Sequence, residues 1–87
     1  MSHQADDQET KIQQFFERAR KGVLKHVSEK GGTITLSDMH EFSMKTYLIQ
    51  HQRFSQMMES FVSEALIDYD AMTQEAALTA KGRKFIE

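Results

Sequence analysis

The stretch that decides the fold is residues 61–86, FVSEALIDYDAMTQEAALTAKGRKFI. Residues 61–66 continue an apolar stripe with helical spacing, and Ile67-Asp68-Tyr69-Asp70 then alternates apolar with polar side chains, as a half-buried strand does. Residues 71–75 form a polar connection, after which Ala76-Ala77-Leu78-Thr79 can pair back as a second strand. The pattern predicts an antiparallel hairpin over residues 67–79. Thr79 is then placed to cap a closing helix over residues 80–86.

Upstream, a long helix is expected between Thr10 and about Lys30. Thr10 followed by Gln13 matches a capping box, and Gly31-Gly32 is typical of a helix end. Apolar residues recur on one face of this segment at spacings of three and four: Ile12, Phe15, Phe16, Ala19, Val23, Leu24 and Val27. Residues 1–9 are acidic and almost without apolar side chains, so we expect a loose tail followed by one domain over residues 10–87.

The middle of the chain predicts a short strand and two helices. Residues 33–36 alternate polar and apolar side chains, and Ser37 is positioned to cap a helix with Asp38 in its first turn. No Gly or Pro occurs between Ser37 and Leu66, so the boundary between the two helices has to be found from the spacing of the apolar residues. Met39 and Phe42 begin one stripe, and a second stripe starts at Phe54. We therefore expect two helices with a boundary between residues 43 and 53.

The predicted order is helix, strand, helix, helix, hairpin, helix, and it resembles that of winged helix-turn-helix domains of small bacterial regulators. Residues 61–70 resemble the end of a recognition helix running into the first wing strand. Leu78-Thr79 followed by Gly82 is similar to the start of the final helix in many such regulators. Two departures are Ala65, where the family commonly has Gly, and a longer span from residue 36 to 65. The resemblance implies a mainly α fold in which the first strand joins the hairpin in a small antiparallel sheet.

Composition excludes several classes of protein. The chain has 87 residues, no Cys, no Pro and no Trp, with 39% hydrophobic and 28% charged residues. Without Cys there is no disulfide framework and no thiolate chemistry. The longest apolar runs fall far short of the ~20 residues that span a bilayer. The acidic N-terminus is unlike a secretory signal, so we expect a cytoplasmic protein.

The resemblance implies DNA binding, with the third helix in the major groove and the wing on the backbone. Polar and basic side chains chemically able to read bases gather around the expected start of that helix. These candidates are Lys45, Tyr47, Gln50, His51, Gln52, Arg53 and Gln56. In the first helix Arg18, Lys21 and Lys25 are candidates for contacts with phosphates or with an acidic partner.

The charge distribution does not favour DNA binding. Residues 37–64 carry two bases against four acids, and the hairpin carries Asp68, Asp70 and Glu75 without a base. Six bases against two acids lie in the first helix, away from the expected reading surface. The resemblance places one function first, that of a small DNA-binding protein, a transcription regulator that acts as a dimer. The alternative, which the charges favour, is a protein-interaction module that uses the acidic wing and a Met-rich surface.

The sequence offers little for catalysis, a metal or a cofactor. The histidines, at positions 3, 26, 40 and 51, never occur at the i, i+4 spacing that brings two imidazoles to one metal. Neither a Gly-rich phosphate loop nor a Gly-x-Ser-x-Gly nucleophile motif is present. We therefore expect a domain that is not an enzyme and binds no cofactor or metal.

Overall fold

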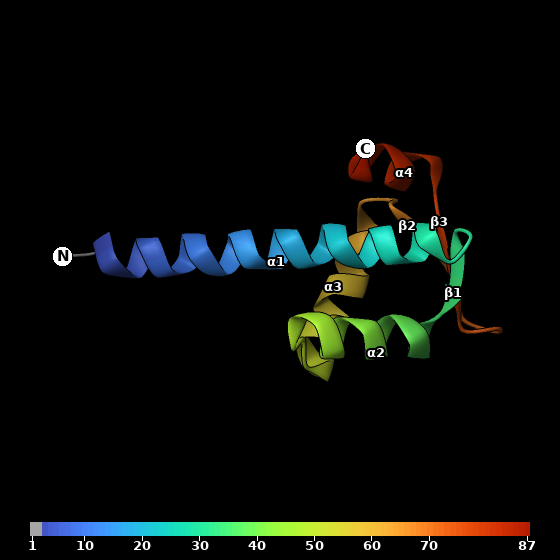
Figure 1. Ribbon diagram of the computed structural model, residues 1–87, viewed down its shortest axis with the longest axis horizontal. Helices are drawn as coiled ribbons and strands as arrows, with labels where there is room; N and C mark the ends of the chain where they lie inside the picture. Colours follow the sequence, from blue (N-terminus) through green and yellow to red (C-terminus); the bar gives the residue numbers. More distant parts are fainter. Residues whose placement is uncertain (1–2) are drawn as a thin grey trace.

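The computed structural model describes residues 3–87, with side chains from Thr10 onward, as a small, mainly helical domain with a three-stranded antiparallel sheet (Figure 1). The elements are α1 (His3–Glu29), β1 (Thr33–Thr35), α2 (Leu36–Tyr47), α3 (His51–Ser63), β2 (Ile67–Asp70), β3 (Glu75–Leu78) and α4 (Ala80–Ile86). This confirms the predicted order of elements and the mainly α class with a small hairpin. Within the described residues, no helix is both long and apolar enough to cross a lipid bilayer.

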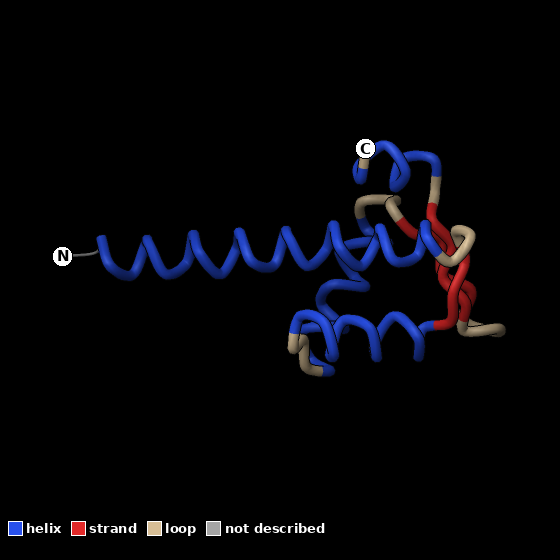
Figure 2. The backbone as a smooth tube through the Cα atoms, viewed as in Figure 1, coloured by secondary structure: helices blue, strands red, loops and turns tan. Residues whose placement is uncertain are grey.

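The sheet lies at one end of the domain, beside the C-terminal end of α1 (Figure 2). Its order is β1-β3-β2, and both pairings are antiparallel, so the first strand does join the hairpin. The register sets Ile34 opposite Ala76 and Ile67 opposite Leu78, and all four side chains are buried. The second hairpin strand covers Glu75–Leu78 rather than residues 76–79, because Thr79 is already the cap of α4.

Helix α1 ends as predicted but begins earlier. Gly31 and Gly32 have φ of 95° and 94°, a left-handed conformation that glycine adopts at little cost. The predicted start at Thr10 is wrong, since α1 begins at His3 and Thr10 lies inside it. Residues 3–21 contain no Gly or Pro that would interrupt the helix. Helical backbone thus runs through residues 3–9, where the sequence predicts a loose tail, and residues 1 and 2 lie outside the described part.

Helix α2 is capped by Thr35, which corrects the prediction of Ser37. The Thr35 hydroxyl oxygen accepts a hydrogen bond from the Asp38 amide at 3.1 Å. The strand is three residues long, so the helix starts directly after it and Ser37 falls in the first turn. Asp38 does lie in that turn, where a negative charge meets the positive end of the helix dipole.

The break between α2 and α3 falls within the predicted range and uses a left-handed leucine. Leu48 has φ 57°, and its amide donates to the Met44 carbonyl at 2.9 Å. The next amide, of Ile49, donates to the Ser43 carbonyl at 3.2 Å, which ends the helix without a glycine. Ile49 is buried, whereas Leu48 is 82% exposed.

The core forms where α1, α2, α3 and the sheet meet. Phe54, Met57 and Phe61 of the second predicted stripe are buried, whereas Val62 and Ala65 of the same stripe are exposed. Phe85 and Ile86 of α4 are half-buried against the core, as expected. The full set of buried apolar residues is Ala19, Val23, Leu24, Val27, Ile34, Met39, Ile49, Phe54, Met57, Phe61, Leu66, Ile67, Ala76 and Leu78.

One charged side chain, Arg20, reaches into this core. It is 5% exposed and pairs with Glu17 at 2.6 Å and with Glu64 at 2.8 Å. Its guanidinium lies 5.5 Å from the ring centroids of Phe61 and Phe85, within the range of a cation–π contact. Burial alone lowers the pKa of Arg20, but its hydrogen bonds to the two carboxylates outweigh burial and raise it. Arg20 therefore ties α1 to the end of α3.

We expect Ala65→Gly to raise the free energy of unfolding by about 0.5 to 1 kcal/mol, because Ala65 has φ 59° and Gly takes this conformation more easily. Ala65 is exposed, so losing its methyl group removes little buried surface. Urea denaturation followed by circular dichroism measures the change. Ala71→Gly in the hairpin turn is the control, since Ala71 is not left-handed and should gain nothing. Equal or lower stability of Ala65→Gly would contradict the prediction.

Candidate functional site: an apolar groove between α3 and the hairpin

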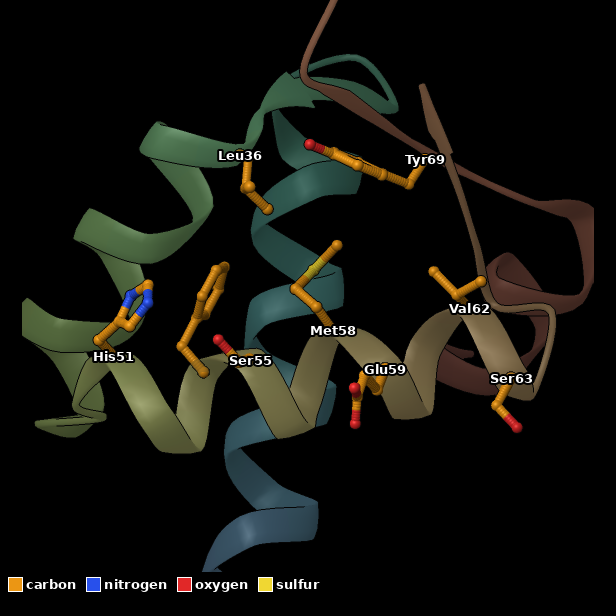
Figure 3. Close-up of a pocket in the computed structure, with 9 residues that line it drawn as sticks. Leu36, His51, Ser55, Met58, Glu59, Val62, Ser63 and Tyr69 are labelled. Atoms are coloured by element: carbon orange, nitrogen blue, oxygen red, sulfur yellow. The ribbon is translucent and has the colours of Figure 1, made fainter. Parts of the chain in front are cut away.

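A groove of about 510 Å³ runs between α3 and strand β2 of the hairpin, and we call it the α3–hairpin groove. Figure 3 shows Met58 and Val62 projecting from α3 toward Tyr69 of β2, with Leu36 at the start of α2 on the far side. Glu59 and Ser63 point to its outer side (Figure 3). The lining residues are Leu36, His51, Phe54, Ser55, Met58, Glu59, Val62, Ser63 and Tyr69.

The helical period of α3 explains which of its side chains face the groove. Phe54, Met57 and Phe61 occupy the core side of α3. Residues at spacings of three and four share a helix face, so His51, Ser55, Met58 and Val62 form the adjoining strip. Val62 is 50% exposed, although it belongs to the apolar pattern of the helix. The groove is therefore lined by apolar groups that the domain itself does not cover.

Strand β2 supplies the opposite wall. Alternate residues of a strand point to the same side, so Tyr69 lies on the same face as the buried Ile67. Tyr69 is two residues beyond Ile67, at the edge of the core, and its side chain is 38% exposed. That phase relation with Ile67 is the sequence signal from which this residue could have been found. Sequence reasoning did not single out Tyr69, Leu36 or Val62 as site residues.

One acidic side chain, Glu59, lines the groove. Asp68 and Asp70 alternate with Ile67 and Tyr69 along β2, so they lie on the opposite face of the hairpin and, with Glu75, line a separate depression there. Neither depression has a Lys or Arg among its described lining residues. Asp70 also has a structural role, since its Oδ1 accepts from the Met72 amide at 2.9 Å and orders the hairpin turn. The groove thus combines an apolar floor with a single acidic lining residue, and the outer face of the hairpin is acidic.

The predicted base-reading residues do not form one surface. Gln50 and Arg53 face α1 and line a second groove, whereas His51 lines the α3–hairpin groove with its ring 5.5 Å from that of His40. Gln52 and Gln56 are exposed on α3. The structure thus separates residues that are adjacent in sequence, because neighbours on a helix point about 100° apart.

Two further candidates, Lys45 and Tyr47, belong to α2 rather than to α3. Tyr47 packs in an edge-on arrangement against Phe15 and Phe42, at centroid distances of 6.4 and 6.1 Å. Lys45 is exposed and pairs with Glu41 at 2.7 Å. The hydrogen bond between them lowers the pKa of Glu41 and raises that of Lys45. Tyr47 is therefore a packing residue, and the charge of Lys45 is compensated locally.

The basic residues Arg18, Lys21 and Lys25 are all exposed and form a stripe on α1. Their spacing places them opposite the buried face that carries Ala19 and Val23. Helix α3 crosses the buried side of α1 (Figure 3), so the basic stripe and the exposed face of α3 point to opposite sides of the domain.

Two of the described histidines, His26 and His40, pack against aromatic rings. His26 stacks on Phe42 with a centroid distance of 3.9 Å, and His40 lies edge-on to Phe54 at 4.9 Å. Among the residues that the structure describes, no three or more His, Cys, Asp or Glu side chains gather closely enough to hold a metal ion.

Comparison with known proteins gives no match for this chain among protein-family models, curated proteins or solved structures.

Proposed function

We propose that the chain is a winged-helix protein-interaction module, not an enzyme, whose α3–hairpin groove binds the apolar face of a basic helix. The order of its elements and the pairing of the first strand with the hairpin support the winged-helix assignment. The observation that carries the function is the chemistry of the groove. Met58 and Val62 of α3 and Tyr69 of the hairpin give the groove an apolar lining, and no Lys or Arg is among its described lining residues, whereas a DNA-binding surface needs cationic side chains.

The groove suits a partner helix with apolar side chains on one face and Lys or Arg beside them. Such helices bind in grooves through anchors at positions i, i+3, i+4 and i+7. A groove of about 510 Å³ accommodates a few such anchors between Val62 and Tyr69. Met58 has an unbranched side chain that can adapt to their shape. Glu59 in the lining then attracts a flanking cation, and the acids on the outer face of the hairpin disfavour phosphates.

The test uses the full chain and a synthetic amphipathic Leu/Lys helix of about five turns as the probe. Methyl NMR spectra of the methionines report the site, since Met58 lies in the groove and Met44 is exposed on α2 away from it. We expect the Met58 signal to shift while that of Met44 does not. Val62→Gln should weaken the affinity about tenfold, equivalent to losing roughly 1.4 kcal/mol of apolar contact.

Two controls make the result specific. Leu48→Gln replaces a more exposed leucine outside the groove, so it should leave the affinity unchanged. A peptide of the same composition in scrambled order keeps the charge but loses the apolar face, and it should not shift Met58. Equal binding of both peptides, or binding that is indifferent to Val62→Gln, would reject the groove as the site.

DNA binding is the second candidate, supported by Gln52, Ser55 and Gln56, which are exposed on α3 and chemically able to bond bases. The measurement is a salt titration with a random duplex of about 20 base pairs, because affinity through several phosphates falls steeply with salt. Our proposal predicts no duplex binding at low salt. Salt-sensitive binding that is weakened in Gln56→Ala, together with an unshifted Met58 in the peptide experiment, would favour DNA binding.

A further inference from the structure

The basic stripe of α1 takes no part in the function proposed above. Arg18, Lys21 and Lys25 lie at spacings of three and four, and Lys11, seven positions before Arg18, falls on the same side of the helix. All four side chains are exposed, and α3 crosses the opposite side of α1 (Figure 3). From Lys11 to Lys25 the cations extend along about 21 Å of helix.

The stripe brings like charges together. Arg18 and Lys21 are neighbours at i, i+3, and Lys21 and Lys25 are neighbours at i, i+4, and like charges at these positions destabilise a helix. Among the side chains that the structure describes, from Thr10 onward, none forms an ion pair with Arg18, Lys21 or Lys25. The three cations therefore repel one another without a counter-ion from the domain.

The acid that could neutralise Lys21 within the helix is engaged elsewhere. Glu17 lies four positions before Lys21, which is the favourable order for a Glu–Lys pair. Its carboxylate instead accepts a hydrogen bond from the buried guanidinium of Arg20 at 2.6 Å. The same chain does form such a local pair on α2, between Glu41 and Lys45 at 2.7 Å. The packing of Arg20 thus leaves the stripe uncompensated, and conflicts of this kind between local and global structure are typical of functional sites.

We propose that the basic stripe of α1 binds an acidic helix of a partner protein, at a surface separate from the α3–hairpin groove. Carboxylates at the same spacings of seven, three and four line up along one face of such a helix. Each cation of α1 then has its own carboxylate, and the repulsion between neighbouring cations is relieved. This proposal does not depend on the function proposed for the groove.

The acids beside the stripe favour a narrow partner. Glu17 borders the stripe next to Lys21 and its side chain is 56% exposed, and Glu29 follows Lys25 one turn later and is also exposed. A single helix can contact the cations without touching either carboxylate. A nucleic-acid duplex or an anionic bilayer is wider, so its phosphates would approach these acids, and like charges placed together cost affinity.

The test uses the full chain and a fluorescent synthetic helix of about five turns, with Glu at these spacings on one face and Ala elsewhere. Fluorescence anisotropy should show binding at about 20 mM salt that weakens steeply toward about 200 mM, because salt screens exposed charges. Lys21→Gln should weaken the affinity about fivefold at low salt. It should not lower the midpoint of thermal unfolding, since Lys21 has like-charged neighbours and no ion-pair partner in the domain.

The matched control is Lys45→Gln, which removes the same charge from an exposed lysine of α2 that is already paired with Glu41. It should leave the affinity unchanged. A second control is a peptide of the same composition with its Glu residues distributed around the helix, which should bind more weakly. Val62→Gln, in the α3–hairpin groove, should not affect the acidic helix, so failure at one surface is distinguishable from failure at the other.

Four results would each overturn the proposal. These are an affinity that is indifferent to salt, an equal loss in Lys21→Gln and Lys45→Gln, equal binding of the two peptides, and a lower unfolding midpoint in Lys21→Gln. A random duplex or a vesicle of anionic lipid provides the last comparison. If either bound as tightly as the acidic helix and lost the same affinity in Lys21→Gln, the stripe would be a phosphate-binding surface instead.

Discussion

Replacing Phe61 with alanine is expected to lower the free energy of unfolding by about 3 to 5 kcal/mol. Phe61 is fully buried at the centre of the apolar stripe of α3, and it heads the fully buried side chains in volume. Arg20 lies over its ring, so the smaller side chain would leave a cavity and also remove a cation–π contact. A chain of 87 residues has only about 4 to 13 kcal/mol of stability in total. The variant should be near its unfolding threshold at room temperature.

Urea and thermal denaturation followed by circular dichroism provide the measurement. The control is Val62→Ala, the next residue along α3, which is 50% exposed and should cost less than about 1 kcal/mol. The contrast between neighbours tests which face of α3 is buried. A Phe61→Ala protein that melts like the parent would mean that the faces of α3 are assigned wrongly.

Element boundaries could be predicted from the sequence where a turn or capping residue, or a change in the spacing of apolar residues, marks them. Gly31 and Gly32 mark the end of α1, and the change from helical spacing to alternation at Ile67 marks the hairpin. Thr79 caps α4 with the predicted hydroxyl, which accepts from the Gly82 amide at 2.9 Å. Each of these signals acts over a few residues, so no knowledge of the tertiary structure is needed to read it.

Capping residues predicted the wrong helix start where the chain offers more than one possible start. Thr10 matches a capping box, but α1 continues past it to His3 because nothing upstream breaks a helix. Thr35 and Ser37 are both good caps, and the length of β1 decides in favour of Thr35. These are errors of a boundary and not of an element. Capping preferences are worth only about 1 kcal/mol, so they do not outweigh helix continuity.

The candidate site was the least predictable part, because it depends on which helix faces meet. The run Gln50-His51-Gln52-Arg53 is continuous in sequence, but its side chains divide between two grooves and open solvent. The α3–hairpin groove instead unites Leu36, Val62 and Tyr69, which are separated by up to 33 positions in the chain. The ion pair of Arg20 also depends on the tertiary structure, since its partner Glu64 lies 44 residues away in the chain.

A second large effect is expected at Gly82, where Gly82→Ala should lower the free energy of unfolding by about 3 kcal/mol through steric overlap and loss of a helix cap. A methyl group at Gly82 would lie 2.7 Å from Cδ1 of Leu78 and far inside contact distance of the Leu66 carbonyl oxygen. That carbonyl is held in place because it accepts from the Thr79 amide at 3.1 Å. Helix α4 would have to move instead, pulling the Gly82 amide from the Thr79 hydroxyl.

The sign of the change at Gly82 distinguishes this contact from simple helix propensity. Gly82 lies in the first turns of α4, and in an unobstructed helix Ala is favoured over Gly by about 1 kcal/mol. Lys81→Ala, at the exposed neighbouring position, gives the control and should change stability by less than about 0.5 kcal/mol. Both variants are compared by urea denaturation. A more stable Gly82→Ala protein would mean that α4 does not pack closely on the start of β2, whereas a large loss supports a close contact that only glycine permits.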